Sequence, residues 1–230
     1  MSHRVAPDPE LTATIAARLA QLRRRIAELT DRDVRIVAVT KGHPAEVAAA
    51  AFEAGCVDLG ESYAQELLAK RRELAEAGIE LPVRWHFVGR LQSNKVRQLA
   101  GVVDLWQSVD RESLAREIAR RAPGARVLVQ LDLAGLPGRG GCPPEEGPAL
   151  VRACRDLGLD VVGLMGVGPP GPPELSREPF ARLVRLADEL ELPERSIGMS
   201  GDVEVAVEAG ATMVRVGSAL VGPRPPRGPA

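Results

Sequence analysis

Eight short apolar runs, rich in β-branched residues, alternate along the chain with segments of helical periodicity. Glycine closes several of the helical segments, as is usual at helix C-termini. A strand and a helix together recur roughly every 25 residues, a pattern typical of a (β/α)8 (TIM) barrel of about 250 residues. The sequence of 230 residues therefore predicts this α/β fold, with a doubly wound open sheet as the alternative. The predicted strands lie near residues 34–40, 56–60, 83–88, 102–109, 126–133, 160–165, 195–199 and 212–217.

The two ends of the chain depart from this repeat. Residues 11–30 carry one apolar stripe at spacings of three and four, which predicts an additional N-terminal helix. After the eighth run only the proline-rich tail 223–230 remains, and we expect it to be disordered. The eighth outer helix is therefore missing or replaced, and the N-terminal helix could cover the gap. We expect residues 1–230 to form a single domain.

The composition indicates a small ligand. Hydrophobic residues at 45% and charged residues at 27% are ordinary for a globular protein. A net charge of -1 argues against a basic face for nucleic acid. Cys56, Cys142 and Cys154 are odd in number and share no C-x-x-C spacing, so neither a disulfide framework nor a zinc site is predicted. No apolar run is long enough to span a membrane and no signal peptide precedes the barrel, so we expect a cytoplasmic protein.

Lys41 stands where the first predicted strand should end, within AVTKGHP (38–44). Because side chains alternate between the two faces of a strand, Lys41 shares a face with Val37 and Val39. If that face lines the barrel interior, the lysine lies at the C-terminal end of the barrel, where barrel enzymes have their sites. The alternative is a lysine that simply extends from a strand end into water.

The eighth predicted strand carries a second cation that should point inward. Val214 and Val216 share one face of this strand, so Arg215 takes the other face. A guanidinium inside a barrel is costly unless it meets an anion or a hydrogen-bond acceptor. A salt bridge to an interior carboxylate is the alternative to a ligand.

Small residues follow the last two strands. Ser200 and Gly201 come after the seventh strand, and Gly217 and Ser218 come after the eighth. In barrels these two loops often hold a phosphate, because glycine allows the backbone to approach the ligand closely. The alternative is that these residues are only helix caps and turns.

An amine, a phosphate site and an inward arginine together fit a compact phosphorylated aldehyde, and pyridoxal 5'-phosphate (PLP) is the obvious candidate. The amine of Lys41 would form an imine with the aldehyde, for which it must be neutral part of the time. Burial and the nearby charge of Arg215 would both lower the pKa of Lys41.

Six stretches of the chain resemble the pyridoxal phosphate homeostasis protein family, relatives of the N-terminal barrel of alanine racemase. They are AVTKGHP (38–44), DLGESYAQEL (58–67), WHFVGRLQSNK (85–95), GLMGV (163–167), GMSGD (198–202) and MVRVGSALVG (213–222). The resemblance implies PLP bound as an aldimine to Lys41, its phosphate held around Ser200, Gly217 and Ser218, and Arg215 at the ring nitrogen or the phosphate. Ser62 and Arg139 depart from the asparagine and lysine that the family often has.

Three functions remain open on this basis. The favoured one is a PLP carrier or homeostasis protein without strong catalytic activity, which delivers the cofactor to PLP-dependent apo-enzymes. The second is a PLP-dependent amino-acid racemase, but the chain has a single tyrosine, Tyr63, and lacks the β-domain with which alanine racemase assembles its dimeric site. The third is an enzyme acting on a phosphorylated sugar through an imine. Because the dimerising domain is absent, we expect a monomer.

The other conspicuous residues have structural interpretations. We expect His86 to be a core histidine with its hydrogen bonds satisfied, and Trp85 and Phe87 to pack on the opposite strand face. Asn94 is the expected N-cap of the following helix. Lys70 and Lys95 lie outside the predicted site and would serve as negative controls for Lys41, although Lys95 could also accept PLP transiently.

Overall fold

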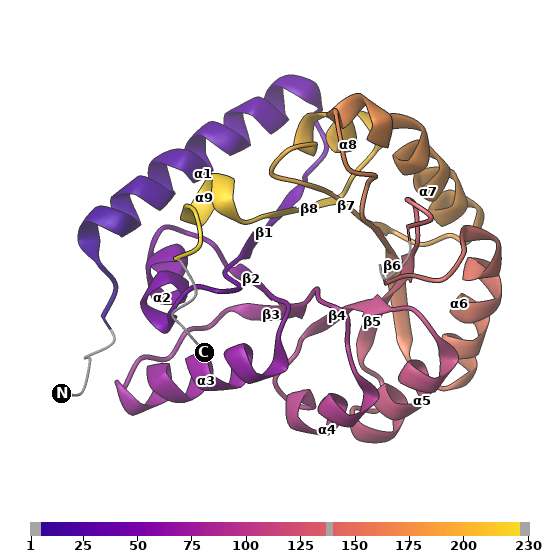
Figure 1. Ribbon diagram of the computed structural model, residues 1–230, viewed down its shortest axis with the longest axis horizontal. Coiled ribbons are helices and arrows are strands. Elements are labelled where there is room, and N and C mark those ends of the chain that lie inside the picture. Colours follow the sequence, from indigo (N-terminus) through magenta and orange to yellow (C-terminus); the bar gives the residue numbers. More distant parts are fainter. Residues whose placement is uncertain (1–5, 137–139, 226–230) are drawn as a thin grey trace.

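The computed structural model describes residues 6–136 and 140–225 and shows a closed barrel of eight parallel strands in sequential order (Figure 1). The (β/α)8 fold is confirmed, and each predicted run overlaps one strand, with bounds that differ by a few residues. The strands are β1 (Arg35–Val39), β2 (Asp58–Glu61), β3 (Arg84–Phe87), β4 (Leu105–Val109), β5 (Arg126–Leu131), β6 (Asp160–Gly166), β7 (Glu194–Met199) and β8 (Met213–Val216).

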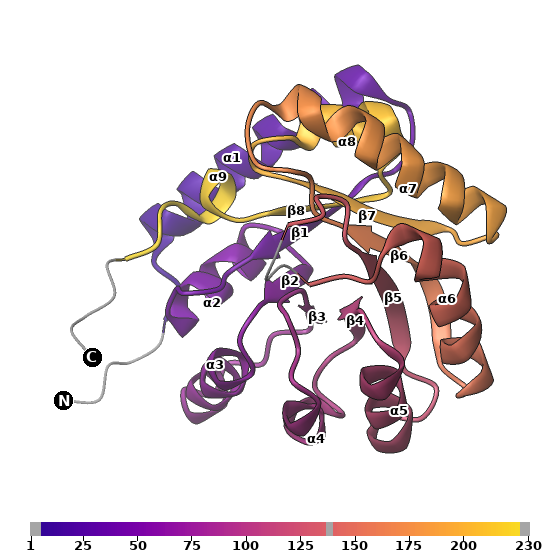
Figure 2. The ribbon, with the colours of Figure 1, turned by 45° about the vertical axis from the view of Figure 1, so that its right-hand side comes forward.

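Helices surround the barrel on its outer side, as Figures 1 and 2 show. Most strands are followed by one helix, which returns the chain to the start of the next parallel strand. The helices are α1 (Pro9–Leu29), α2 (Ala45–Glu53), α3 (Ala64–Glu76), α4 (Val96–Leu99), α5 (Glu112–Arg121), α6 (Gly147–Asp156), α7 (Arg177–Glu189), α8 (Val203–Ala209) and α9 (Ser218–Val221). Short 3-10 turns η1 (Ser93–Lys95), η2 (Pro144–Glu146) and η3 (Pro173–Ser176) precede α4, α6 and α7.

The N-terminal helix fills the place of the eighth outer helix. After β8 the chain forms only the four-residue helix α9, and α1 packs against α9, α8 and α2. Arg18 Nη1 donates a hydrogen bond of 3.2 Å to the carbonyl oxygen of Leu220, and Arg25 forms an ion pair of 2.5 Å with Glu204 of α8. The N-terminal helix α1 therefore covers the gap that the missing eighth outer helix would leave, as expected.

The apolar residues divide between the inside of the barrel and the layer beneath the helices. A small buried cluster inside the barrel includes Val37 of β1 and Met213 of β8. Val214 and Val216 belong instead to the large cluster that the helices cover. The strand faces deduced from alternation are therefore the observed ones, and Arg215, between the two valines, points inward.

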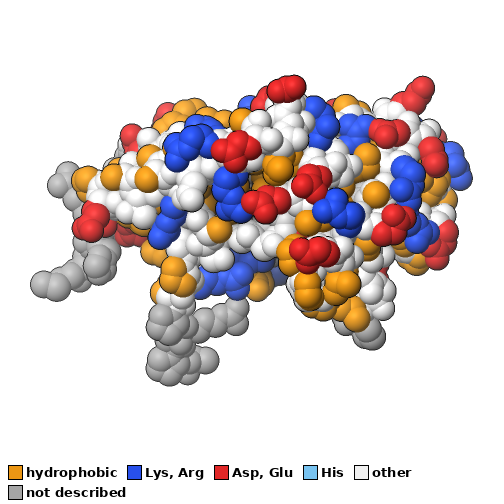
Figure 3. All heavy atoms as spheres, turned by 90° about the horizontal axis from the view of Figure 1, so that it is seen from above, with side chains coloured by type: hydrophobic (Ala, Val, Ile, Leu, Met, Phe, Trp, Pro, Cys, Tyr) orange, Lys and Arg blue, Asp and Glu red, His pale blue; other side chains and the backbone are white. Residues whose placement is uncertain are grey.

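The surface shows no dominance of one charge on the face drawn in Figure 3, where basic and acidic side chains are interspersed. In the described part of the chain, no helix has the length and apolar character needed to cross a bilayer. Of the predicted tail, the structure describes residues 223–225, and Arg224 lies against Gly42. Arg139 and residues 226–230 lie outside the described residues.

Candidate functional site

Lys41 lies in a turn at the C-terminal end of the barrel, two residues beyond the end of β1. The strand pairing continues to the Thr40 N–H, which donates to the Gly60 carbonyl at 3.0 Å, and the His43 N–H then donates back to the Thr40 carbonyl at 3.1 Å. Gly42 has a φ of +74°, a conformation that favours glycine and allows this turn. The strand is therefore shorter than predicted, and the lysine begins the loop.

The amine of Lys41 is easier to deprotonate than that of an ordinary lysine. Its side chain is half-buried, and burial lowers the pKa of Lys41, with further lowering by the positive charges of Arg224 and Arg215. Glu61 and Glu66 act in the opposite direction. The expected effect of burial and of Arg215 on this pKa is therefore present, and it makes the amine a better nucleophile near neutral pH.

Arg224 is a neighbour of Lys41 that the sequence did not predict. It lies in the proline-rich tail, where no strand or helix periodicity indicates its position. In the structure its side chain lies over Gly42, so that a β-carbon added there would be 3.0 Å from Arg224 Cδ. Only the return of the chain past α9 brings this cation to the turn that carries Lys41.

Arg215 is buried inside the barrel, with 4% of its surface exposed. Nη1 donates to the carbonyl and hydroxyl oxygens of Ser196, at 2.6 and 2.7 Å, and Nη2 donates to the carbonyl oxygen of Gly166 at 2.8 Å. Burial lowers the pKa of Arg215 to about 10, so the guanidinium stays charged at neutral pH. Its observed partners among the described residues are uncharged oxygens, not the interior carboxylate considered above.

A chain of polar side chains continues from Ser196 across the barrel interior. The Ser196 hydroxyl donates to Gln107 Oε1 at 2.7 Å, and Gln107 Nε2 donates to His86 Nδ1 at 2.7 Å. Nε2 of His86 must then carry the proton, which it donates to Asp58 Oδ1 at 2.9 Å. His86 is therefore a satisfied core histidine, as expected.

The residues predicted to hold a phosphate lie at the ends of β7 and β8. Ser200 and Ser218 are exposed, and Gly217 is half-buried at a point where an added β-carbon would lie 3.4 Å from the Val39 carbonyl oxygen. The end of β8 thus lies directly beside the end of the strand that leads to Lys41. Met199 pairs with Arg215, so Ser200 follows the same edge of the barrel.

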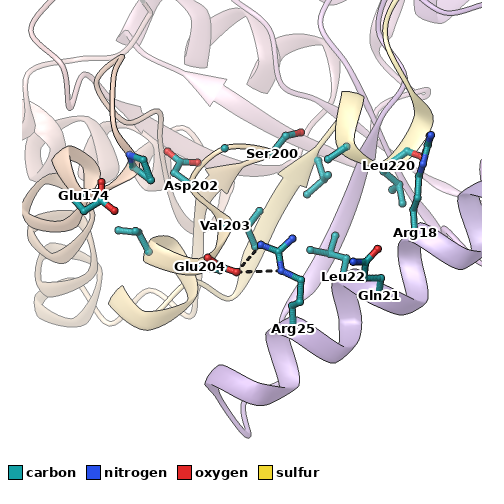
Figure 4. A pocket seen from close by; sticks show the side chains of 15 residues that line it. Arg18, Gln21, Leu22, Arg25, Glu174, Ser200, Asp202, Val203, Glu204 and Leu220 are labelled. Atoms are coloured by element: carbon teal, nitrogen blue, oxygen red, sulfur yellow. Dashed lines mark hydrogen bonds and ion pairs between the residues drawn. The ribbon is translucent and has the colours of Figure 1, made fainter.

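The turn after β7 also borders a cavity on the outer side of the barrel. Figure 4 shows this cavity between α1 and the start of α8, with Ser200 at its edge. Its volume is about 150 Å³. Lys41 and Arg215 are not among the residues that line it. Asp202 stands before α8, but its carboxylate accepts from the Met199 N–H at 2.6 Å and from the Ser176 hydroxyl at 3.2 Å, and caps no N–H of α8.

Two expectations about neighbouring residues are wrong. Lys70 cannot serve as a negative control for Lys41, because it is 3% exposed and forms a buried ion pair with Glu61. A mid-helix lysine normally reaches water, and only the packing of α3 on β2 places this one against a carboxylate. Asn94 is not an N-cap, because it lies inside the 3-10 turn η1, which delays the start of α4 to Val96. Trp85 and Phe87 are buried beneath the helices as expected.

The comparisons with known proteins agree on one family. The family model for the N-terminal domain of alanine racemase matches residues 12–225. The chain is 39% identical over 226 residues to the pyridoxal phosphate homeostasis protein of Pseudomonas aeruginosa, covering 92% of this chain and 96% of that protein. Its identity to the protein of the same name from Aquifex aeolicus is 38% over 225 residues, covering 90% and 97% of the two chains.

Solved structures give the same result. The structure of PipY from Synechococcus elongatus with PLP bound is similar at 35% identity and a TM-score of 0.79, covering 90% of this chain and 100% of that one. An alanine racemase of Clostridium difficile, at 17% identity and a TM-score of 0.71, shares the fold over 90% of this chain and 56% of its own length. Because the relatives from Pseudomonas aeruginosa and Aquifex aeolicus are 39% and 38% identical to this chain and align over nearly their whole length, this chain belongs to the pyridoxal phosphate homeostasis protein family.

Proposed function

We propose that this protein binds PLP at the mouth of the barrel, holds it as an imine (Schiff base) on Lys41, and takes part in vitamin B6 homeostasis by keeping and delivering the cofactor. The observation that carries this proposal is the half-buried amine of Lys41, whose pKa is lowered by burial, Arg224 and Arg215. An aldehyde reacts with the neutral amine, so this environment favours imine formation. A lysine that merely extended into water would not have its pKa lowered by burial.

The ends of β7 and β8 suit the phosphate of PLP. Ser200 and Ser218 offer exposed hydroxyl groups, and Gly217 lets a ligand approach the backbone beside the Val39 carbonyl. These residues lie at the same barrel edge as Lys41. A phosphate bound there would place the aldehyde of a compact ring within the mouth, toward the β1 turn.

Arg215 would face the ring nitrogen of PLP. It lies two residues before Gly217 and is buried inside the barrel, deeper than the exposed serines. A fixed cation at this position disfavours protonation of the ring nitrogen, which many PLP enzymes need to withdraw electrons from the substrate. This arrangement suits retention of the cofactor better than its use in catalysis.

The similarity to pyridoxal phosphate homeostasis proteins favours a homeostasis protein over a racemase. Racemisation requires a proton acceptor and donor on opposite faces of the substrate carbon. The only tyrosine of the chain, Tyr63, is 42% exposed on the rim after β2. An amino-acid racemase remains the second candidate because the fold is that of the alanine racemase barrel, although a shared fold alone does not transfer a reaction.

The experiment is an absorbance spectrum of the purified protein with and without added PLP, followed by borohydride reduction and peptide mapping. We expect the visible band of a cofactor imine and a reduced label on Lys41. Lys41→Ala should lose both, whereas Lys95→Ala should keep both. A label that persists unchanged in Lys41→Ala would contradict the proposal, and rapid racemisation of any amino acid in a panel would favour the second candidate.

A further inference from the structure

The two peptide groups on either side of Lys41 are held by side chains of the neighbouring helix. Lys70 Nζ donates a hydrogen bond of 2.6 Å to the carbonyl oxygen of Thr40. Glu66 Oε2 accepts a hydrogen bond of 2.8 Å from the N–H of Gly42. Both side chains belong to α3, which follows the next strand of the barrel.

The carboxylate of Glu61 completes this arrangement from the end of β2. Glu61 Oε1 accepts a hydrogen bond of 2.6 Å from the Thr40 hydroxyl and forms an ion pair with Lys70. Both charged side chains are almost fully buried, with 3% of Lys70 and none of Glu61 exposed. A buried ion pair adds little net stability, because the cost of removing two charges from water offsets their attraction. Stability alone therefore does not account for this pair.

We propose that Glu66, Lys70 and Glu61 are positioning residues for Lys41, which together fix the turn that presents its amine to the PLP aldehyde. The inference rests on the proposed function of Lys41 and deepens it. It also gives a role to the stretch DLGESYAQEL (58–67), which supplies both glutamates and which direct contact with the cofactor left unexplained.

The turn needs such support because few backbone hydrogen bonds hold it. Lys41 lies beyond the last paired residues of β1. Gly42 has a left-handed backbone conformation, and glycine adopts positive and negative φ values about equally readily. Loss of the side-chain contacts would let the turn sample other conformations. A reacting group that is less well oriented reacts more slowly even when its chemistry is unchanged.

Charge and position act on the amine in opposite directions, so an experiment separates them. The charge of Glu66 raises the pKa of Lys41, so its removal should lower this pKa and leave more neutral amine near pH 7. Glu66→Gln removes the charge but keeps an oxygen that accepts from the Gly42 N–H. Glu66→Leu removes both the charge and the acceptor.

The test measures the rate at which PLP-free protein forms the imine after PLP is added, by its visible absorbance. Positioning predicts that Glu66→Leu reacts about fivefold more slowly than Glu66→Gln, the effect of losing one hydrogen bond. Competitive labelling of the Lys41 amine over a range of pH, in the absence of PLP, measures its pKa in both variants. We expect the pKa of Lys41 to lie below the wild-type value by the same amount in Glu66→Gln and in Glu66→Leu. Glu76→Leu, an exposed position at the end of α3, is the matched control and should react like the wild type.

The ion pair is tested with a variant that leaves no buried charge unpaired. Lys70→Met alone would strand the carboxylate of Glu61, so Glu61→Gln and Lys70→Met are combined. We expect this double variant to remain folded, with an unchanged thermal transition or a higher one, and to form the imine at least fivefold more slowly than the wild type. The single variant Lys70→Arg, which keeps a positive donor beside Glu61, should retain part of the wild-type rate.

Equal rates for Glu66→Gln and Glu66→Leu, together with a wild-type rate in the folded double variant, would overturn the positioning role while leaving the imine on Lys41 intact. A wild-type protein that forms no imine on Lys41 would instead contradict the proposed function itself. The two failures are therefore distinguishable.

Discussion

Arg215 Nη1 lies 2.6 Å from the carbonyl oxygen and 2.7 Å from the hydroxyl oxygen of Ser196, and it donates a hydrogen bond to each. The guanidinium is thereby fixed inside the barrel by the preceding strand. The same serine continues the polar chain to Gln107 and His86. Hydrogen bonds within the barrel core therefore fix the orientation of Arg215.

Replacement of Arg215 by glutamine should weaken PLP binding without unfolding the barrel. In the proposed site the variant loses a charged donor to the ring, and a hydrogen bond to a charged group contributes roughly 1.5–3 kcal/mol, which corresponds to about a tenfold to hundredfold loss of affinity. Fluorescence titration with PLP measures this affinity, and circular dichroism checks the fold. Arg126→Gln, at a half-exposed position at the start of β5, is the control and should bind normally. Unchanged affinity of Arg215→Gln would remove this residue from the site.

The rate of imine formation should follow the lowered pKa of Lys41. We expect the rate to rise with pH and to reach half its maximum below the ordinary lysine pKa of about 10.4. Arg224→Gln removes a positive charge that lowers the pKa of Lys41, so its midpoint should move to higher pH and its rate near pH 7 should fall. A midpoint that stays at the wild-type pH in Arg224→Gln would show that the tail does not act on the amine. Arg116→Gln on α5 is the matched control.

Asp58 should contribute stability that is lost in acid. Burial by itself would raise the pKa of Asp58, but hydrogen bonds from Arg84 and His86 outweigh it and hold this pKa far below its usual range. The folded state therefore binds fewer protons than the unfolded chain, so the contribution is complete above the unfolded pKa of about 3.9 and declines as the pH falls below it. Asp58→Asn should lower the free energy of unfolding at pH 7 by about 2–3 kcal/mol, from the loss of hydrogen bonds to a charged group.

Urea unfolding of the wild type and Asp58→Asn at pH 7 and at successively lower pH measures this contribution. The difference between the two proteins should shrink as the pH is lowered below about 4, because the wild-type carboxylate then loses its advantage. A constant difference over the whole series would mean that the stabilisation does not depend on the charge of Asp58.

The three cysteines should be inert in the folded protein. Burial raises the pKa of Cys56 and of Cys142 to about 11, and that of Cys154 to about 12, so almost no thiolate exists near neutral pH. A thiol reagent at pH 8 should therefore label none of them rapidly in the native state and all three after unfolding in guanidinium chloride. Rapid labelling of one native cysteine would reveal local opening around it.

The sequence by itself determined the barrel and the inward direction of Arg215. Repetition of strand and helix predicts the topology, because parallel strands require a crossover between them. Strict alternation along a strand predicts which side chains point inward, so Val214 and Val216 were sufficient to orient Arg215. The small residues Ser200, Gly217 and Ser218 were assigned to the strand ends because they directly follow the predicted strands.

The tertiary structure alone decided which groups surround these residues. Periodicity assigns a side chain to a face but does not identify its partner across the fold. Lys70 was therefore placed outside the predicted site although it lies buried against Glu61, and Arg224 was assigned to a tail although it lies over Gly42. The polar chain from Arg215 to Asp58 joins strands β8, β7, β4, β3 and β2, and only closure of the barrel brings these strands around one interior. Desolvation and nearby charge set the reactivity of Lys41, and both depend on contacts between distant parts of the chain.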